Sequence, residues 1–200
     1  MIEHSKFDHQ VLQLRKIILE GVSYFIVWQA LNREYENSIQ TLDHTGFWWK
    51  YSGFFAPARN ALLWSTLLQI SKAYDKDPRN LSLGKLLKIA LENRKELVPY
   101  ATRGSLRAIF NKIDNNALLL QRLRRYRNQR LAHFDAELNE NIELPTEEVQ
   151  TLVEETKSIF NSLKCSYEGK YDDFNDIMEN VYLHTSHVIV IMNKANRTTS

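Results

Sequence analysis

The stretch VLQLRKIILEGVSYFIVWQALNREY, residues Val11–Tyr35, decides the class of this fold. Its apolar side chains recur at steps of three and four residues, at Leu14, Ile17, Ile18, Val22, Phe25, Trp28 and Leu31. This spacing follows the 3.6-residue turn of an α-helix and gives the helix one broad apolar face. Such a face must be buried against other elements. The stretch therefore predicts a helical bundle.

The rest of the chain repeats the helical pattern. The further helices are expected at 47–74, 83–93, 105–132, 147–164 and 174–195. The prediction is an all-α bundle of about five to six helices, in a single domain spanning 1–200 with 194–200 as a frayed tail. The β-branched run HVIVIM within the last helix is also compatible with a strand.

Local signals predict where these helices begin and bend. Ser82, Ser105 and Thr146 are expected N-caps, because their hydroxyl groups accept hydrogen bonds from free backbone N–H groups. Pro57 is expected to kink the second helix or to mark its true start, because proline lacks the N–H that continues the ladder. The segment ELVPYATRG is expected to be a linker.

Composition narrows the class of protein. The 200 residues are 44% hydrophobic and 25% charged, with a net charge of +2, so any nucleic-acid contact must come from a local patch. The single cysteine, Cys165, excludes an internal disulfide framework and a four-cysteine zinc site. The start MIEHSKFDHQ lacks an apolar signal core, and no run of about 18 apolar residues is present. We expect a cytoplasmic protein without a membrane segment.

The basic run QRLRRYRNQRLAHFDAEL, Gln121–Leu138, is the candidate functional motif. At about 100° per residue, Arg127 falls in the stripe of the leucines at 120, 123 and 131. It therefore points toward a core or a subunit interface, where arginine is uncommon without a partner. His133 diverges from Arg127 by about 120° and about 9 Å on an unbroken helix. Both can line one cleft if the helix ends near Ala132.

This set of side chains suits RNA cleavage. A histidine titrates near neutral pH and can move a proton to or from the 2′-hydroxyl or the leaving 5′-oxygen. An arginine can hold the phosphate and stabilise its added charge. One histidine is too few for both acid and base, so a symmetric dimer would bring two copies of the motif to one cleft. The same residues also fit a solvated basic helix with a favourable dipole contact.

The segment RNQRLAH, Arg127–His133, resembles the arginine, polar residue and histidine signature of the HEPN superfamily, the higher eukaryote and prokaryote nucleotide-binding domains. The longer RNQRLAHFD and the earlier ISKAYDKDPRNLSLGKLL resemble the branch found in phage abortive-infection systems. The resemblance covers roughly residues 12–163.

The resemblance implies a dimeric bundle of four or more helices that acts as a metal-independent endoribonuclease, in a toxin or antiviral role. Carried over by position, Arg127 and His133 are the catalytic pair and Asn128 orients or contacts the substrate. Asp135 would support His133 or cap the helix. A further branch carries a modified tyrosine two residues after the histidine, where this chain has Asp135, so this form of control is not expected.

Three hypotheses remain open at this point. The first is the ribonuclease, with RNA as substrate and an antitoxin or neighbouring defence protein as a further partner. The second is a catalytically silent module that binds RNA or protein through its basic patch. The RNA-binding residues expected in that patch are Arg122, Arg124, Arg125 and Arg130. In the third, Arg127 only pairs with a carboxylate at a helix interface, and its loss costs stability.

Other candidates carry weaker signals. His184, His187 and Glu179 have spacing that zinc could use, but no further ligand completes the set, so no metal and no cofactor are expected. Trp48 and Trp49 suit a core or a dimer interface better than base stacking. Arg59 could contact phosphate from the second helix, although a surface role fits it better. A glycine-rich phosphate loop is absent from the sequence.

Overall fold

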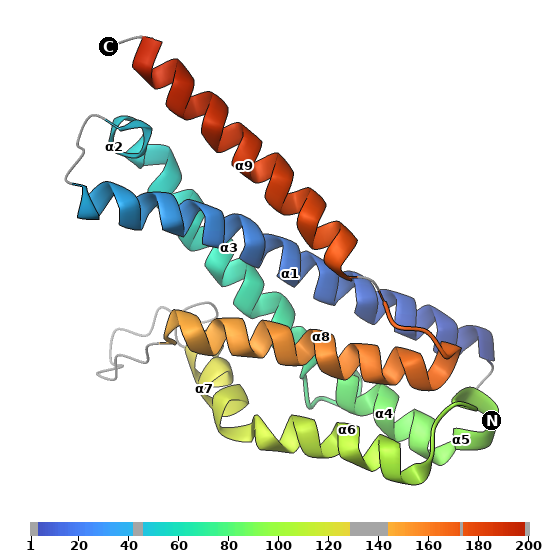
Figure 1. Ribbon diagram of the computed structural model, residues 1–200. Helices are drawn as coiled ribbons and strands as arrows, with labels where there is room; N and C mark the ends of the chain where they lie inside the picture. The colour runs from blue at the N-terminus through green and yellow to red at the C-terminus, as the bar shows by residue number, and fades with distance from the viewer. Residues whose placement is uncertain (1–3, 42–45, 129–143, 173, 199–200) are drawn as a thin grey trace. The chain divides into compact units, whose positions relative to one another are not determined.

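The computed structural model describes residues 4–41, 46–128, 144–172 and 174–198 (Figure 1). Its helices are α1 (His4–Gln40), α2 (Phe47–Lys50), α3 (Ser52–Ala73), α4 (Leu83–Glu92), α5 (Arg94–Leu97), α6 (Arg103–Asn115), α7 (Ala117–Arg127), α8 (Thr146–Glu168) and α9 (Phe174–Thr198). Within these ranges every regular element is a helix, which confirms the all-α class.

The described part holds nine helices, so the expected number of five to six is wrong. Two expected helices are each divided: 47–74 into α2 and α3, and 105–132 into α6 and α7. The break before α3 lies at Tyr51, whereas Pro57 lies inside the helix. The expected linker ELVPYATRG includes part of α5, a single turn. The run HVIVIM is helical and belongs to α9, which continues into the expected tail as far as Thr198.

The helix starts follow local hydrogen bonding. Ser82 caps α4 as predicted, and its Oγ accepts from the backbone N–H of Lys85 at 3.4 Å. Helix α6 begins earlier than predicted, because Thr102 is its N-cap and Ser105 is the third residue of a reciprocal capping box. Helix α8 has Pro145 at its N-cap position instead of the predicted Thr146.

The break between α6 and α7 lies at Asn116. Its side-chain Nδ2 donates to the carbonyl of Lys112 at 2.9 Å, and its backbone N–H donates to the carbonyl of Ile113. Asparagine competes in this way with the regular helical ladder. The chain therefore changes direction before α7, the helix that carries the basic run.

Contacts between Cα atoms divide the chain into two compact units. Unit 1 comprises residues 1–21 and 67–172, and unit 2 comprises residues 22–66 and 173–200. The long helices α1 and α3 each contribute to both units. The single domain over 1–200 stays a prediction.

Unit 1 is built on α6, which packs against α4 and α8. Figure 1 shows α6 and α8 side by side and running in opposite directions. The fully buried residues of unit 1 include Phe7, Leu14, Ile18, Leu83, Leu86, Leu87, Leu106, Ile159, Phe160 and Leu163. At about 1.5–3 kcal/mol for each buried side chain, this apolar core is the main stabilising contribution.

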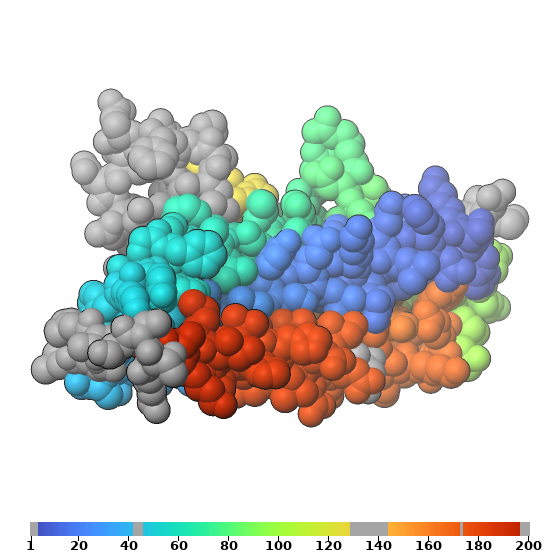
Figure 2. Space-filling view, turned by 90° about the horizontal axis from the view of Figure 1, so that it is seen from above, coloured from blue at the N-terminus to red at the C-terminus, as the bar shows by residue number. Residues whose placement is uncertain are grey.

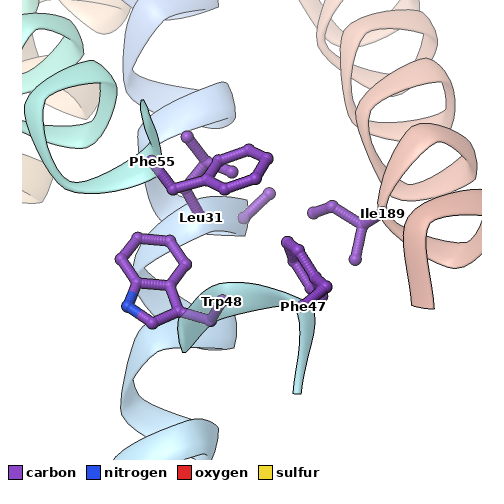
Figure 3. Close-up of a cluster of buried hydrophobic side chains, with 6 residues drawn as sticks. Leu31, Phe47, Trp48, Phe55 and Ile189 are labelled. Atoms are coloured by element: carbon purple, nitrogen blue, oxygen red, sulfur yellow. The ribbon is translucent and has the colours of Figure 1, made fainter. Parts of the chain in front are cut away.

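Unit 2 has its own aromatic cluster (Figure 3). The cluster consists of Ala30, Leu31, Phe47, Trp48, Phe55 and Ile189. The Phe47 and Phe55 rings meet edge to face with centroids 5.3 Å apart. Ile189 from the run HVIVIM completes the cluster. The outer side of α9 lies at the surface (Figure 2) and exposes Leu183, Val188 and Ile191.

Asp172, the last residue of unit 1, carries a buried carboxylate. Asp172 accepts a two-pronged hydrogen bond from the Arg15 guanidinium and a further bond from Lys164 Nζ at 3.3 Å. Burial alone would raise the pKa of Asp172, but its bonds to Arg15 and Lys164 outweigh burial and lower the pKa. The carboxylate therefore stabilises the fold while it is ionised.

We expect Asp172→Asn to lower the free energy of unfolding at pH 7 by about 2 kcal/mol, because it removes a charged hydrogen-bond acceptor from two cations. Since the folded-state pKa of Asp172 lies below its unfolded value of about 3.9, this stabilisation is complete above that pH and is lost as the pH falls through the folded value. Urea unfolding at pH 7 and pH 3 measures both effects. An equal loss for Asp172→Asn at the two pH values would contradict this account.

Candidate active site at the end of helix α7

Arg127 is the last residue of α7, and Asn128 is its C-cap. The Arg127 guanidinium donates from Nε and Nη2 to the Asn128 side-chain oxygen, at 3.2 and 3.1 Å. It donates from Nη1 to the Ser71 Oγ at 3.1 Å. Ser71 is itself 3% exposed and belongs to the last turns of α3. Three hydrogen bonds therefore hold a half-buried guanidinium in one orientation.

Arg127 lies on the same side of α7 as the buried leucines, as the helical spacing predicts. Leu120 and Leu123 from the same stripe are 3% and 1% exposed. Arg127 lies one turn further along, at the margin of this buried face. Among the described residues, no carboxylate forms an ion pair with Arg127. The hypothesis that Arg127 serves only as one half of a buried ion pair thus gains no support from this part of the chain.

Asp75 is a charged neighbour of this site. It follows α3 and accepts hydrogen bonds from the Asp77 backbone N–H at 2.9 Å and from Asn80 Nδ2 at 3.0 Å. The bond from Asp77 lowers the pKa of Asp75 most, and the positive charge of Arg127 lowers it further. Asp75 is thus a carboxylate at neutral pH. It contributes negative potential beside Arg127 without neutralising it through an ion pair.

Tyr74 directly precedes Asp75 in the chain, but its side chain belongs to the buried core. Its hydroxyl forms a hydrogen bond of 3.1 Å with Thr156 Oγ1 on α8. Burial is the main cause that raises the pKa of Tyr74 to about 12. Tyr74 therefore stays protonated at neutral pH and is a poor candidate for a general base.

The other described arginines of the basic run have different settings. Arg122 forms an ion pair with Glu148 at the start of α8. Arg124 is half-buried and lines a pocket, whereas Arg125 is exposed. These side chains therefore lie on different faces of the helix. A binding role for Arg122 would have to compete with Glu148, whereas Arg125 is open to solvent.

The remaining motif residues, Arg130, His133 and Asp135, lie outside the described residues. Their expected roles in RNA binding, proton transfer and support of the histidine stay predictions. The described half of the motif consists of Arg127 and Asn128, and the hydrogen bond from Arg127 to Ser71 joins this half to the end of α3.

The weaker candidates have structural settings of their own. No group of three or more His, Cys, Asp or Glu side chains arranged for a metal occurs in the described ranges, and His184, His187 and Glu179 are exposed on α9. Trp48 is buried in the cluster of unit 2, as its core interpretation predicts. Arg59 stacks over the Tyr35 ring, 4.1 Å from its centroid.

Within the described part, no helix combines the length and hydropathy needed to cross a bilayer.

Ser71 and Asp75 lie near Arg127 only because the helices pack together in the folded chain. Ser71 lies 56 positions from Arg127, and nothing in the local sequence marks it as a partner of an arginine. A helical projection of α3 carried through Tyr74 could have placed Ser71 and Asp75 near one face, because residues four apart are neighbours on a helix. That projection does not reveal which helix they meet.

The family model HEPN_AbiU2, described as AbiU2, matches residues 5–187 of the chain. The comparison with curated proteins gives no significant match, and neither does the comparison with solved structures.

Proposed function

This chain belongs to the HEPN AbiU2 family, a module related to abortive infection, and from that premise we propose that it is a metal-independent endoribonuclease acting as a toxin or phage-defence effector. In this proposal it works in the cytoplasm on RNA, and an antitoxin or a neighbouring defence protein controls it. Arg127 binds the scissile phosphate, Asn128 orients Arg127, and His133 transfers protons. Arg125 and Arg130 supply further contacts to the RNA backbone.

One observation carries the proposal: Arg127 is held in place but keeps hydrogen-bonding capacity. Of the five N–H groups of a guanidinium, three are used on Ser71 and Asn128. The hydroxyl and the amide oxygen that accept these bonds are uncharged. A half-buried, oriented cation that keeps two N–H donors unused among the described residues suits the planar recognition of a phosphate.

The proposed reaction needs only groups of the protein and the substrate. The 2′-oxygen attacks phosphorus, the bond from phosphorus to the 5′-oxygen breaks, and the products are a 2′,3′-cyclic phosphate and a 5′-hydroxyl. One base removes the proton of the 2′-hydroxyl, and one acid protonates the leaving 5′-oxygen. Arg127 stabilises the negative charge that grows on the non-bridging oxygens.

The need for both an acid and a base supports a dimer. Each motif supplies one histidine, His133, so two motifs facing one cleft would supply both groups. We therefore propose that the active site is composite and lies at the interface of two copies of the chain.

The test is incubation of the purified protein with total tRNA and with a single-stranded RNA in EDTA. We expect cleavage that leaves 2′,3′-cyclic phosphate and 5′-hydroxyl ends, because attack by the 2′-hydroxyl yields both. Ends with a 5′-phosphate would contradict this chemistry. Salt-sensitive RNA binding without any product would instead favour the catalytically silent binding module.

A further inference from the structure

A pocket of about 690 Å³ opens in unit 1 between α4, α6 and the first turns of α7. This volume falls within the range of about 300–1,000 Å³ that is typical of small-molecule sites. The pocket wall is largely apolar and includes Ile89 from α4, Phe110 and Ile113 from α6, and Leu120 from α7. A flat aromatic ring system can lie against such a wall and remove apolar surface from water.

Cations surround this apolar wall. Lys85 and Lys88 line the pocket from α4, and Arg124 lines it from α7. Lys85 donates to the carbonyl of Arg79 at 3.4 Å. In the described part of the chain, Lys88 and Arg124 form no ion pair, so their positive charges remain available to an anionic ligand.

The carboxylates of the pocket divide into two groups. Asp75 and Asp77 already accept hydrogen bonds from their own loop, including backbone N–H groups of Asp77 and Arg79 at 2.9 Å. Asp114 and Glu92 also line the pocket, and both residues are exposed. These last two can accept hydrogen bonds from amino or hydroxyl groups of a ligand.

The pocket adjoins Arg127. Arg124 lines the pocket and lies three residues before Arg127, so both arginines project from the same side of α7. Asp75 also lines the pocket and experiences the charge of Arg127. A polymer held at Arg127 would therefore place a neighbouring unit within reach of the pocket.

We propose that this pocket holds one nucleotide of the RNA chain, next to the phosphate that Arg127 binds. The base lies on the wall formed around Phe110 and Ile113, and a phosphate lies against Lys88 and Arg124. Asp114 and Glu92 accept hydrogen bonds from the amino groups of the base or the hydroxyl groups of the ribose. This inference rests on the proposed ribonuclease function and assigns that enzyme a site for base preference.

The first test is binding of nucleoside 5′-monophosphates to the full chain, measured by calorimetry or by ligand-observed magnetic resonance. At least one of the four monophosphates should bind tenfold or more tightly than inorganic phosphate, because the base adds contacts with the apolar wall. Equal binding of inorganic phosphate and all four monophosphates would overturn the proposal, since the wall would then contribute nothing.

A matched pair of variants locates the binding. Lys88→Glu reverses a charge in the pocket, whereas Lys95→Glu makes the same change at an exposed residue of α5 outside the pocket. Lys88→Glu should weaken monophosphate binding at least tenfold, and Lys95→Glu should change it less than twofold. Equal weakening by both variants would show a general charge effect and would overturn the proposal.

A third experiment distinguishes a site for one nucleotide of an RNA chain from a site for a free nucleotide. A trinucleotide with 2′-O-methyl groups, which cannot be cleaved, should displace the bound monophosphate and bind more tightly. Failure to displace it would overturn the assignment to RNA and leave a site for free nucleotides. All three binding measurements are independent of cleavage. RNA cleavage with normal kinetics in Lys88→Glu would therefore refute only the proposal that the pocket binds a nucleotide of the RNA substrate. Nucleotide binding without any RNA cleavage would refute only the proposal that the protein is a ribonuclease.

Discussion

Replacing His133 with alanine is expected to lower the rate of RNA cleavage by about 10²–10⁴-fold, because a positioned general acid or base contributes about that much. The matched control is His184→Ala, which removes an exposed histidine from α9. We expect this control to retain full cleavage. Single-turnover rates in EDTA measure the loss, and circular dichroism shows whether both variants keep their helical content.

Equal cleavage by the wild type and by His133→Ala would remove the histidine from the mechanism. Loss of cleavage together with loss of helical content would instead assign His133 to the fold. In that case His133→Gln, which keeps a polar side chain of similar size, separates the two roles. A folded His133→Gln variant with unreduced cleavage would contradict proton transfer at this position.

Replacing Arg127 with alanine is expected to lower the cleavage rate by about 10²–10³-fold, because it removes a donor that stabilises the charge of the transition state. Arg127→Lys should recover little of this rate, since a lysine ammonium cannot reproduce the planar two-pronged contact of a guanidinium. Arg125→Ala is the matched control on an exposed face of the same helix. We expect it to weaken RNA binding slightly and to leave the maximal rate unchanged.

Thermal melting separates this catalytic role from a purely structural one. Arg127 hydrogen-bonds to the uncharged Ser71 and Asn128 side chains. Its loss should therefore cost about 1.5–3 kcal/mol, the usual net contribution of hydrogen bonds to a charged group. A loss above this range, up to about 5 kcal/mol, would indicate that Arg127 is one half of a buried ion pair.

Mixed dimers test whether two chains share the active site. A dimer of one wild-type chain and one His133→Ala chain keeps both Arg127 side chains but only one of the two histidines that the proposed cleft needs. Its cleavage rate should lie far below about half of the wild-type rate, because one histidine cannot serve as both acid and base. A mixed dimer that forms and keeps about half of the wild-type rate would contradict the composite site.

The helices were largely predictable from the sequence, and their interruptions were not. Steps of three and four residues marked α1, because helical periodicity depends only on neighbouring positions. The hydroxyl of Ser82 marked the start of α4 for the same reason. The break at Asn116 was missed, because Ile113 before it and Leu120 after it continue the helical spacing and hide a local competition between side chain and backbone.

The candidate site was predictable in part. The helical stripe of Leu120 and Leu123 indicated that Arg127 lies at the margin of the core, since direction around a helix is a local property. The neighbours at that margin were not predictable, because they come from another helix. Ser71, Asp75 and the pocket belong to this group.

The sequence by itself determined the helical class, the main helices and the family, because periodicity, capping and the motif from Arg127 to His133 reside in short segments. Only the tertiary structure decided that the end of α3 supplies Ser71 to Arg127, that Arg122 pairs with Glu148, and that Arg124 lines a pocket. These features depend on packing between helices that are distant in sequence. Such packing arises from the burial of many apolar side chains together, and no local pattern encodes the partner of a single polar group.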